Sequence, residues 1–185
     1  MIVTPTPLPG VLVVEPKMFG DGRGYFLETW QEARYREAGI PAEFVQDNVS
    51  FSRRGVLRGL HFQHPGDQAK LVTVLEGEVF DVAVDVRVGS PHFGKSTSVV
   101  LTGASKRQLF IPRGFAHGFC VTSDTALFMY KCSDPYSPST EMGVAHGDPD
   151  LAIAWPIADP AVSEKDSRYP RLRDIDPARL PRYVT

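Results

Sequence analysis

Cysteine, long apolar runs and basic leader residues are scarce in this sequence, and each scarcity excludes a class of protein. The two cysteines, Cys120 and Cys132, lie in separate apolar stretches of the 185-residue chain, so neither a disulfide scaffold nor a thiolate zinc site is expected. No apolar run reaches the roughly 18 residues that a membrane-spanning helix needs. The first residues also lack the basic start and apolar stretch of a signal peptide. We therefore expect a cytoplasmic protein with no membrane partner.

An excess of charge of one sign is also missing. The chain has 20 Lys plus Arg and 22 Asp plus Glu, which gives a formal net charge of -2. This balance creates no overall field that would attract nucleic acid or anionic lipid, so no nucleic-acid partner is expected. An anionic ligand must therefore be bound by a local group of Arg and Lys side chains.

Short apolar runs separated by Gly, Pro, Asp and Ser make up most of the chain and predict many short strands. The predicted strands cover residues 11–14, 25–28, 44–46, 56–62, 71–75, 79–88, 98–101, 108–111, 119–121 and 127–130. Within 79–88 the valines at even positions share one face, whereas Asp81, Ala83 and Asp85 share the other. Glu76-Gly77-Glu78 is predicted to be a hairpin turn between two of these strands.

Helix is scarce, with one short helix predicted over 30–38 and ended by Gly39 and Pro41. Many short strands with closely spaced turns predict an all-β jelly roll with a few short peripheral helices. A chain of this length buries roughly 70% of its unfolded surface, which suits a single domain spanning residues 1–185. The segment from residue 160 onward is richer in Pro, Asp and Arg, and we expect it to wrap the barrel.

Two histidine-containing segments stand out. Residues 55–63 read as a strand in which His61 shares a face with Gly59 and Gln63, while Arg58 lies on the opposite face. Farther on, Pro112-Arg113-Gly114-Phe115-Ala116-His117 matches the P-x-G-x-x-H pattern of the second cupin motif. Taken alone, a histidine in an apolar strand is more often an ordinary core or surface residue.

The metal-ligand set of metal-dependent cupins is broken in this chain. Such proteins need two histidines and a downstream Glu in the first motif, but His61 and His64 are three residues apart and point to opposite faces of one strand. No suitably spaced carboxylate follows before Lys70. The sequence therefore favours a cupin without a metal site.

Two further charged features have an ordinary reading when taken alone. Lys70, at the start of an apolar strand, would be a solvated edge charge, or else a cation that points into the mouth of the barrel. Ser163-Glu164-Lys165-Asp166 would be an exposed charged turn.

Together these segments closely resemble the dTDP-4-dehydrorhamnose 3,5-epimerase family along nearly the whole chain. The matching stretches are residues 19–21, 23–24, 46–48, 55–63, 70–72, 77–85, 89–90, 106–108, 111–119, 130–131, 148–149, 155–156 and 163–166. So many matches in one order are far more specific than any single motif. The resemblance implies a cofactor-free enzyme that moves protons beside the ketone of a dTDP-linked 4-keto-6-deoxyhexose.

The resemblance also implies catalytic roles. His61 would be the base, because an imidazole exchanges protons near neutral pH, with Asp166 as its orienting partner. Lys70 would stabilise the oxyanion on carbon 4, and Tyr130 would be the acid on the other face of the sugar. Tyr136 is a weaker rival for the acid.

Substrate contacts follow in the same way. Arg58 and Arg23 would bind the diphosphate, because guanidinium groups suit phosphate oxygens. Tyr136 would lie against the sugar or the base, and His117 would bind substrate or help to hold the oxyanion. The remaining contacts implied by the family are Glu28, Gln46, Asp47, Asn48, Glu141 and Lys165.

The resemblance further implies a homodimer, in which the N-terminal strand adds to the partner's sheet and some substrate contacts come from the neighbouring subunit. No cofactor and no metal are implied. Two alternatives remain open at this point. One is a mono-epimerase acting at a single carbon of a related nucleotide 4-keto-6-deoxy sugar. The other is a sugar-binding or metal-dependent cupin.

Overall fold

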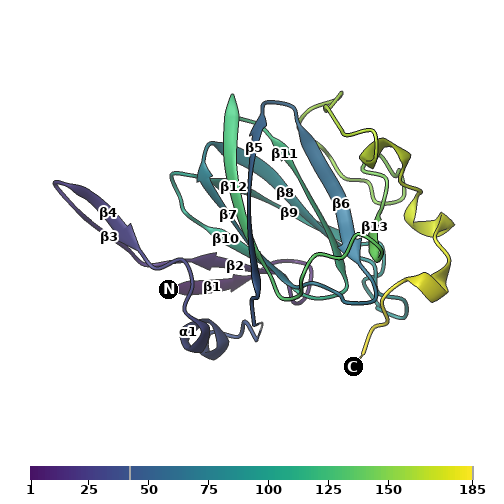
Figure 1. Ribbon diagram of the computed structural model, residues 1–185, viewed down its shortest axis with the longest axis horizontal. Helices are drawn as coiled ribbons and strands as arrows, with labels where there is room; N and C mark the ends of the chain where they lie inside the picture. Colours follow the sequence, from purple (N-terminus) through teal and green to yellow (C-terminus); the bar gives the residue numbers. More distant parts are fainter. Residues whose placement is uncertain (42, 185) are drawn as a thin grey trace.

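Two antiparallel β-sheets pack face to face in the computed structural model, which describes residues 1–41 and 43–184 (Figure 1). The larger sheet has the strand order β1 (Ile2–Pro5), β2 (Leu12–Glu15), β10 (Gln108–Ile111), β7 (Lys70–Glu76), β12 (Thr125–Cys132) and β5 (Gln46–Arg53). The smaller sheet has the order β13 (Glu141–Gly143), β6 (Leu57–Gln63), β11 (Phe115–Val121), β8 (Glu78–Asp85) and β9 (Ser96–Thr102). This all-β jelly roll confirms the fold class predicted from the sequence.

A hairpin of β3 (Met18–Asp21) and β4 (Gly24–Leu27) belongs to neither sheet and projects from the body of the molecule, at the left of Figure 1. The chain then enters α1 (Glu32–Glu37), where the Gln31 side chain accepts a hydrogen bond of 2.7 Å from the Arg34 amide. The short helix predicted over 30–38 is thus confirmed. Single-turn 3-10 helices occur at Asp166–Arg168, Leu172–Asp174 and Pro177–Arg179.

The largest apolar cluster fills the space between the two sheets. Val72 and Phe128 of the larger sheet pack there with Ala83, Phe119 and Val121 of the smaller one. Burial of these side chains holds the sheets together, at roughly 25 cal/mol for each Å² of apolar surface removed from water.

The outer face of the smaller sheet is also apolar, because the C-terminal segment covers it. Val82, Val84 and Val86 pack there against Leu172 and Leu180. Ala83 lies in the opposite cluster, so the alternation predicted for residues 79–88 is confirmed.

A third cluster lies on the outer face of the larger sheet. Tyr35 of α1 and the nearby Ile40 pack there against Val14, Leu71 and Phe110. The helix therefore anchors the segment that leads from the projecting hairpin back to the body of the molecule.

Strand limits differ from the prediction where polar side chains face the interior. The predicted strand at 44–46 is wrong in extent, because β5 runs from Gln46 to Arg53. Its outward side chains include the exposed Val49 and Phe51, while Asn48 and Ser52 point inward. Because the apolar residues of β5 face outward, the usual pattern of buried apolar residues does not predict this strand. The predicted strand at 79–88 also ends earlier, at Asp85.

The predicted hairpin turn at Glu76-Gly77-Glu78 is wrong. β7 and β8 belong to different sheets, so this segment is a crossing from one sheet to the other. Gly77 has a φ of +83°, and a Cβ there would lie 2.0 Å from the Thr125 carbonyl oxygen. A glycine is needed at position 77 because the backbone of Thr125 leaves no room for a side chain, and not because of a hairpin turn.

Candidate active site

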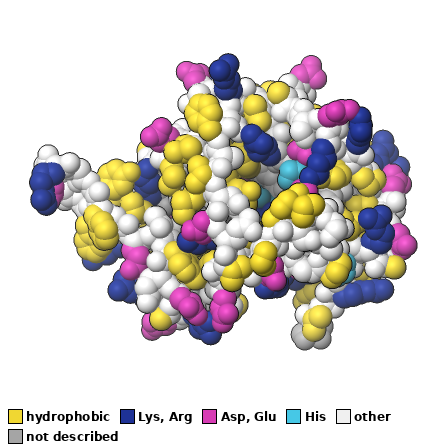
Figure 2. Space-filling view, viewed as in Figure 1, with side chains coloured by type: hydrophobic (Ala, Val, Ile, Leu, Met, Phe, Trp, Pro, Cys, Tyr) yellow, Lys and Arg dark blue, Asp and Glu magenta, His cyan; other side chains and the backbone are white. Residues whose placement is uncertain are grey.

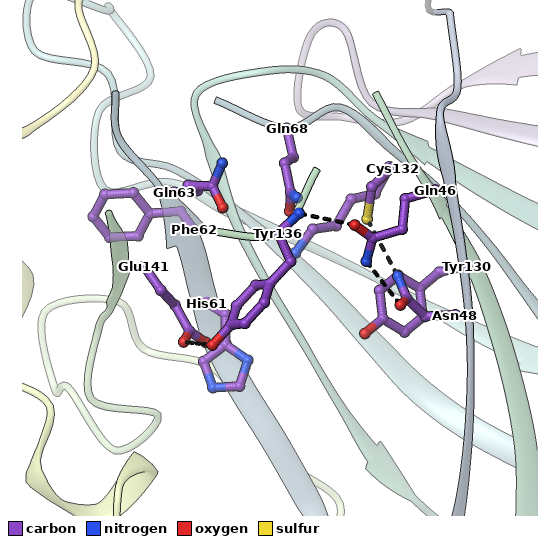
Figure 3. Close-up of a pocket in the computed structure, with 11 residues that line it drawn as sticks. Gln46, Asn48, His61, Phe62, Gln63, Gln68, Tyr130, Cys132, Tyr136 and Glu141 are labelled. Carbon is purple, nitrogen blue, oxygen red and sulfur yellow. Dashed lines mark hydrogen bonds between the residues drawn. The ribbon is translucent and has the colours of Figure 1, made fainter. Parts of the chain in front are cut away.

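A cavity of about 250 Å³ opens among strands of both sheets and the loops beside them. Figure 2 shows a hollow on this face with a histidine inside it and Lys and Arg side chains around it. Figure 3 shows the side chains that point into the cavity. The lining residues are Gln46, Asn48, His61, Phe62, Gln63, Gln68, Lys70, Tyr130, Cys132, Tyr136 and Glu141.

His61 and Asp166 form a hydrogen-bonded pair in the wall of this cavity. The His61 Nε2 atom lies 2.9 Å from Asp166 Oδ1, and the other carboxylate oxygen accepts a bond of 3.2 Å from the Gly59 amide. Burial alone would raise the pKa of Asp166, but the hydrogen bond and charge of His61 and the Gly59 bond outweigh it and lower the pKa. Asp166 is therefore an ionised partner that orients the ring and balances its positive charge.

The C-terminal segment brings Asp166 to β6 by pairing with it. Val56 and Ala161 form a parallel bridge, and the Leu57 amide donates to the Ala161 carbonyl at 3.0 Å. The Ser163 hydroxyl then accepts a bond of 3.0 Å from the Asp166 amide at the start of the 3-10 helix. Backbone pairing thus places the Asp166 carboxylate beside β6, independently of its side-chain bonds.

A β-bulge re-aims Arg58 toward the side of the sheet that His61 occupies. The pairing of β11 with β6 shifts by one residue between His117 opposite His61 and Phe119 opposite Arg58. As a result, Arg58 and His61 line one groove with Asp166, and the prediction that Arg58 lies on the opposite face from His61 is wrong. A Cβ on Gly59 would lie 2.5 Å from the Gly118 Cα, so the bulge needs a glycine.

Lys70, the first residue of β7, lies directly opposite Cys132 of β12, and both side chains line the cavity. Its ammonium group has no hydrogen-bond or ion-pair partner among residues 1–41 and 43–184. Burial lowers the pKa of Lys70, and the nearby Cys132, Glu141 and Asp81 oppose this effect. An unpaired, poorly hydrated cation of this kind interacts strongly with an anion in the cavity.

Tyr130 lies on β12 opposite Asn48 of β5, on the same cavity. Burial raises the pKa of the phenol, Cys132 and Glu141 add to this, and the charge of Arg58 opposes it. The phenol is therefore protonated at neutral pH and is available as a proton donor.

Glu141 links two further side chains at the rim of the cavity. Its Oε2 atom accepts a hydrogen bond of 2.6 Å from the Tyr136 hydroxyl and also pairs with the Lys165 ammonium group. Burial alone would raise the pKa of Glu141, but these bonds and the Lys165 charge outweigh it and lower the pKa. The rim beside His61 is therefore polar and charged.

Four predicted site residues are brought neither to the cavity nor to the groove beside it. Arg23 lies on the projecting hairpin, with 91% of its side chain exposed, and pairs with Asp21. Glu28 pairs with Arg34 beside α1. Asp47 pairs with Lys131 at 2.9 Å, on the face of the larger sheet away from the cavity.

His117, the fourth, lies inside the core. Its Nε2 atom is 3.0 Å from both carboxylate oxygens of the buried Asp81, and its ring stacks on Phe128. Burial raises the pKa of Asp81, while the charge and hydrogen bond of His117 and the charge of Lys70 oppose this. His117 is therefore a buried side chain that does not line the cavity.

Other cavity residues were missed as site residues, including Phe62, Gln63, Gln68 and Cys132. The placement of Gln63 on the His61 face of its strand was a usable signal for one of them. Tyr169 was also missed, and its ring lies edge-on to His61 with centroids 5.7 Å apart. No pattern in the sequence pointed to this residue.

Two other kinds of feature are absent from the described residues. There, no helix combines the length and apolar character needed to cross a membrane. In the same part of the chain, no three His, Cys, Asp or Glu side chains gather in an arrangement suited to a metal ion.

Comparison with known proteins gives matches along almost the entire chain. The family model described as dTDP-4-dehydrorhamnose 3,5-epimerase matches residues 5–174. A Shigella flexneri protein named dTDP-4-dehydrorhamnose 3,5-epimerase is 51% identical over 178 residues, which cover 95% of this chain and 98% of that protein. A Streptomyces niveus protein named dTDP-4-dehydrorhamnose 3-epimerase is 43% identical over 188 residues, which cover 100% and 91% of the two chains.

A solved structure is similar in three dimensions. It is the dTDP-6-deoxy-D-glucose-3,5-epimerase of Legionella pneumophila in complex with dTDP-4-keto-L-rhamnose. The TM-score is 0.97 at 50% sequence identity, and the match covers 100% of this chain and 99% of that one.

Proposed function

This chain belongs to the dTDP-4-dehydrorhamnose 3,5-epimerase family, and we propose that it inverts carbons 3 and 5 of dTDP-4-keto-6-deoxy-D-glucose to give dTDP-4-keto-L-rhamnose. The family predicted from the sequence motifs is thereby confirmed. The observation that carries the proposed activity is a single cavity that is lined by His61, Lys70 and Tyr130, with Asp166 hydrogen-bonded to His61.

The reaction begins with proton abstraction next to a ketone. The carbonyl at carbon 4 acidifies the protons on carbons 3 and 5, so loss of either gives an enolate. His61 removes the proton, and Asp166 at 2.9 Å stabilises the imidazolium that forms. Lys70 stabilises the negative charge on the carbon 4 oxygen, a role supported by its unpaired ammonium group in the cavity.

Inversion is completed by a proton from the opposite face. Tyr130 lies on the larger sheet and His61 on the smaller one, so their side chains reach the cavity from different walls. The raised pKa of Tyr130 keeps its phenol protonated until the enolate forms. Two such cycles, one at each carbon, convert the substrate without redox change, so the chemistry needs no redox cofactor.

Binding of the nucleotide diphosphate requires positively charged side chains near the cavity, because the net charge of -2 gives no general attraction for an anion. Arg58 lies in the groove beside His61, with Lys165 on the same groove. Gln46 and Asn48 line the cavity and offer amide groups to the substrate. These positions support the predicted contacts of Arg58, Lys165, Gln46 and Asn48.

We propose that the protein is a homodimer and that Arg23 and Glu28 serve the partner's cavity. Apolar side chains are exposed on the projecting hairpin, where Phe19 is 53% and Phe26 70% exposed, and on the outer face of β5. Figure 2 shows hydrophobic side chains gathered over these elements. A second copy that covered them would bury the apolar surface and take the hairpin into its own site.

The experiment that tests the activity is proton NMR in deuterated water with purified protein and dTDP-4-keto-6-deoxy-D-glucose. Loss of both the carbon 3 and carbon 5 proton signals, with trapping of the product by a downstream reductase, is the expected result. Exchange at one carbon alone would make this a mono-epimerase, as the 3-epimerase name of the Streptomyces niveus relative suggests. No exchange at either carbon, with folded protein, would refute the proposed function.

A further inference from the structure

Three glutamine side chains hold the loop that carries Tyr136. Gln46 of β5 accepts a hydrogen bond of 2.8 Å from the Tyr136 amide, and Gln63 of β6 accepts one of 2.8 Å from the Ser137 amide. Gln68 donates a bond of 2.7 Å to the Asp134 carbonyl. Figure 3 shows the three glutamines around the Tyr136 side chain. Both sheets therefore contribute to fixing residues 134–137, which we call the tyrosine loop.

Gln63 has the largest share of these bonds. Besides the Ser137 bond, its amide nitrogen donates to the Gly66 carbonyl at 2.6 Å and to the Pro135 carbonyl at 3.3 Å. The side chain is only 6% exposed. A buried amide that satisfies backbone groups on two loops joins those loops, and its removal leaves these groups without partners.

The tyrosine loop lies beside the cavity, because its Tyr136 side chain is one of the lining residues. Tyr136 is 51% exposed, yet its hydroxyl is fixed by the 2.6 Å bond to Glu141. The phenol therefore spans the mouth of the cavity from the loop to β13. A small displacement of the loop would break that bond and widen the mouth.

A glutamine suits this task better than a charged residue of the same length. Its amide offers a donor to two carbonyl groups and an acceptor to one N–H group at the same time. A glutamate would place negative charge against the Gly66 and Pro135 carbonyl oxygens. The arrangement is also neutral, so it adds no charge to the wall that Lys70 and His61 share.

We propose that Gln63, assisted by Gln68, is a positioning residue that holds the tyrosine loop so that Tyr136 closes the cavity mouth over the bound nucleotide sugar. Gln63 acts through Tyr136 and takes no part in proton transfer. This inference rests on the proposed function, because it assigns the loop to the same site and substrate.

The test is a comparison of KM with kcat for Gln63→Met, which keeps the side-chain length and removes all the hydrogen bonds. The KM is expected to rise about tenfold, with kcat changing less than about threefold. The Kd of dTDP alone, measured by calorimetry, is expected to rise in parallel. In a Tyr136→Ala background, Gln63→Met is expected to cause no further rise, because residues that act as a unit are not additive.

Ser123→Ala is the matched control for a general loss of stability. The Ser123 hydroxyl also bonds to the backbone, accepting from the Glu78 amide and donating to the Thr125 carbonyl at 2.7 Å each, but it lies outside the cavity. Its KM is expected to match that of the wild type. If Gln63→Met does not fold, Gln68→Met removes a single bond from the same loop and should raise KM in the same direction, by less.

Two results would overturn the inference. One is a fall in kcat with an unchanged KM in Gln63→Met, or in Gln68→Met where that variant is needed. The other is a KM effect that adds fully to that of Tyr136→Ala. In both cases the wild type is active and the proposed function stands. A wild type that neither exchanges substrate protons nor binds dTDP would instead refute both proposals.

Discussion

The two carboxylate oxygens of Asp166 have different partners, the ring of His61 and the amide of Gly59, and these two bonds fix the orientation of the carboxylate. At the scale of the residue, the site therefore separates its tasks. In the proposed mechanism, the His61–Asp166 pair removes the proton and Lys70 stabilises the negative charge of the enolate. Tyr130 donates the returning proton, and burial raises the pKa of its phenol.

His61→Ala removes the proposed base. Deuterium uptake at carbons 3 and 5 is expected to fall at least about 100-fold, because a positioned general base contributes on that order. Proton NMR in deuterated water measures the rate at each carbon. His92→Ala, a histidine between β8 and β9 outside the cavity, is the control and should exchange at the wild-type rate. Uptake above about a tenth of wild type in His61→Ala would contradict its role as base.

Tyr130→Phe removes the proposed acid and leaves the base in place. Completed epimerisation is expected to slow by about 100-fold, whereas proton abstraction slows far less, because the phenol is needed only after the enolate forms. Comparing product formation with deuterium uptake separates the two steps. Tyr183→Phe, whose ring lies over the Arg87 guanidinium group, is a control for loss of a phenol elsewhere. Equal losses in both rates would exclude Tyr130 as the acid.

At the scale of the element, β5 and β6 each depart from the usual strand pattern at the site. β5 carries amide and hydroxyl side chains on its inner face and apolar ones on its outer face. β6 contains the bulge that brings Arg58 to the side of His61. Strands that line a polar cavity carry polar side chains on the face that usually buries apolar ones, so the usual inside-apolar pattern is absent at the proposed site.

The end of β8 is held by a buried ion pair that makes a pH dependence testable. Asp85 accepts bonds of 2.9 and 2.6 Å from the Arg87 guanidinium and 2.7 Å from the Ser90 hydroxyl. Burial alone would raise the pKa of Asp85, but these bonds lower it. Its contribution to stability is therefore present above the unfolded pKa of ~3.9 and is lost as pH falls toward the lowered value.

Asp85→Asn is expected to lower the free energy of unfolding at pH 7 by about 3 kcal/mol, because it leaves the Arg87 charge partly buried without its partner. The difference from wild type should shrink as pH falls below about 4. Urea unfolding at several pH values measures both effects. Asp124→Asn, whose carboxylate is fully exposed and 4.0 Å from Arg54, should leave stability unchanged. A difference that is constant with pH would contradict this account.

At the scale of the whole molecule, the projecting hairpin is the feature that a single chain does not explain. The hairpin projects from the body (Figure 1). It carries Arg23 and exposed aromatic side chains. An isolated two-stranded hairpin is marginally stable in water, which favours a partner that covers it. The proposed homodimer supplies that partner and would bring Arg23 to the partner's cavity.

Mixing two inactive variants tests whether Arg23 acts on the partner's site. In a dimer with exchanged hairpins, His61→Ala and Arg23→Ala subunits reassort so that about a quarter of all sites carry neither change. Activity is therefore expected to return after the two variants are unfolded and refolded together. Mixing His61→Ala with Tyr130→Phe is the control. His61 and Tyr130 line the cavity of the same chain, so every site in this mixture carries one of the two changes and no activity should return. No recovery with Arg23→Ala would place Arg23 in its own subunit's site or outside any site.

The sequence by itself determined the all-β class, the alternation in β8, the short helix and the residue types that can perform the chemistry. These depend on local periodicity and on the order of motifs, which are written in neighbouring residues. His61, Lys70, Tyr130 and Asp166 were identified in this way through the family resemblance.

The tertiary structure alone decided which of these residues meet. Arg58 turned toward the side of His61 because a bulge shifts the register, and His117 lies in the core because it pairs with Asp81. The proposed positioning role of Gln63 depends on its bonds to Gly66 and Ser137, which lie on loops that approach Gln63 only in the folded protein. Such contacts depend on strand pairing and close approach between residues far apart in the sequence, such as Gly59 and Asp166, which are 107 positions apart. No local pattern encodes them.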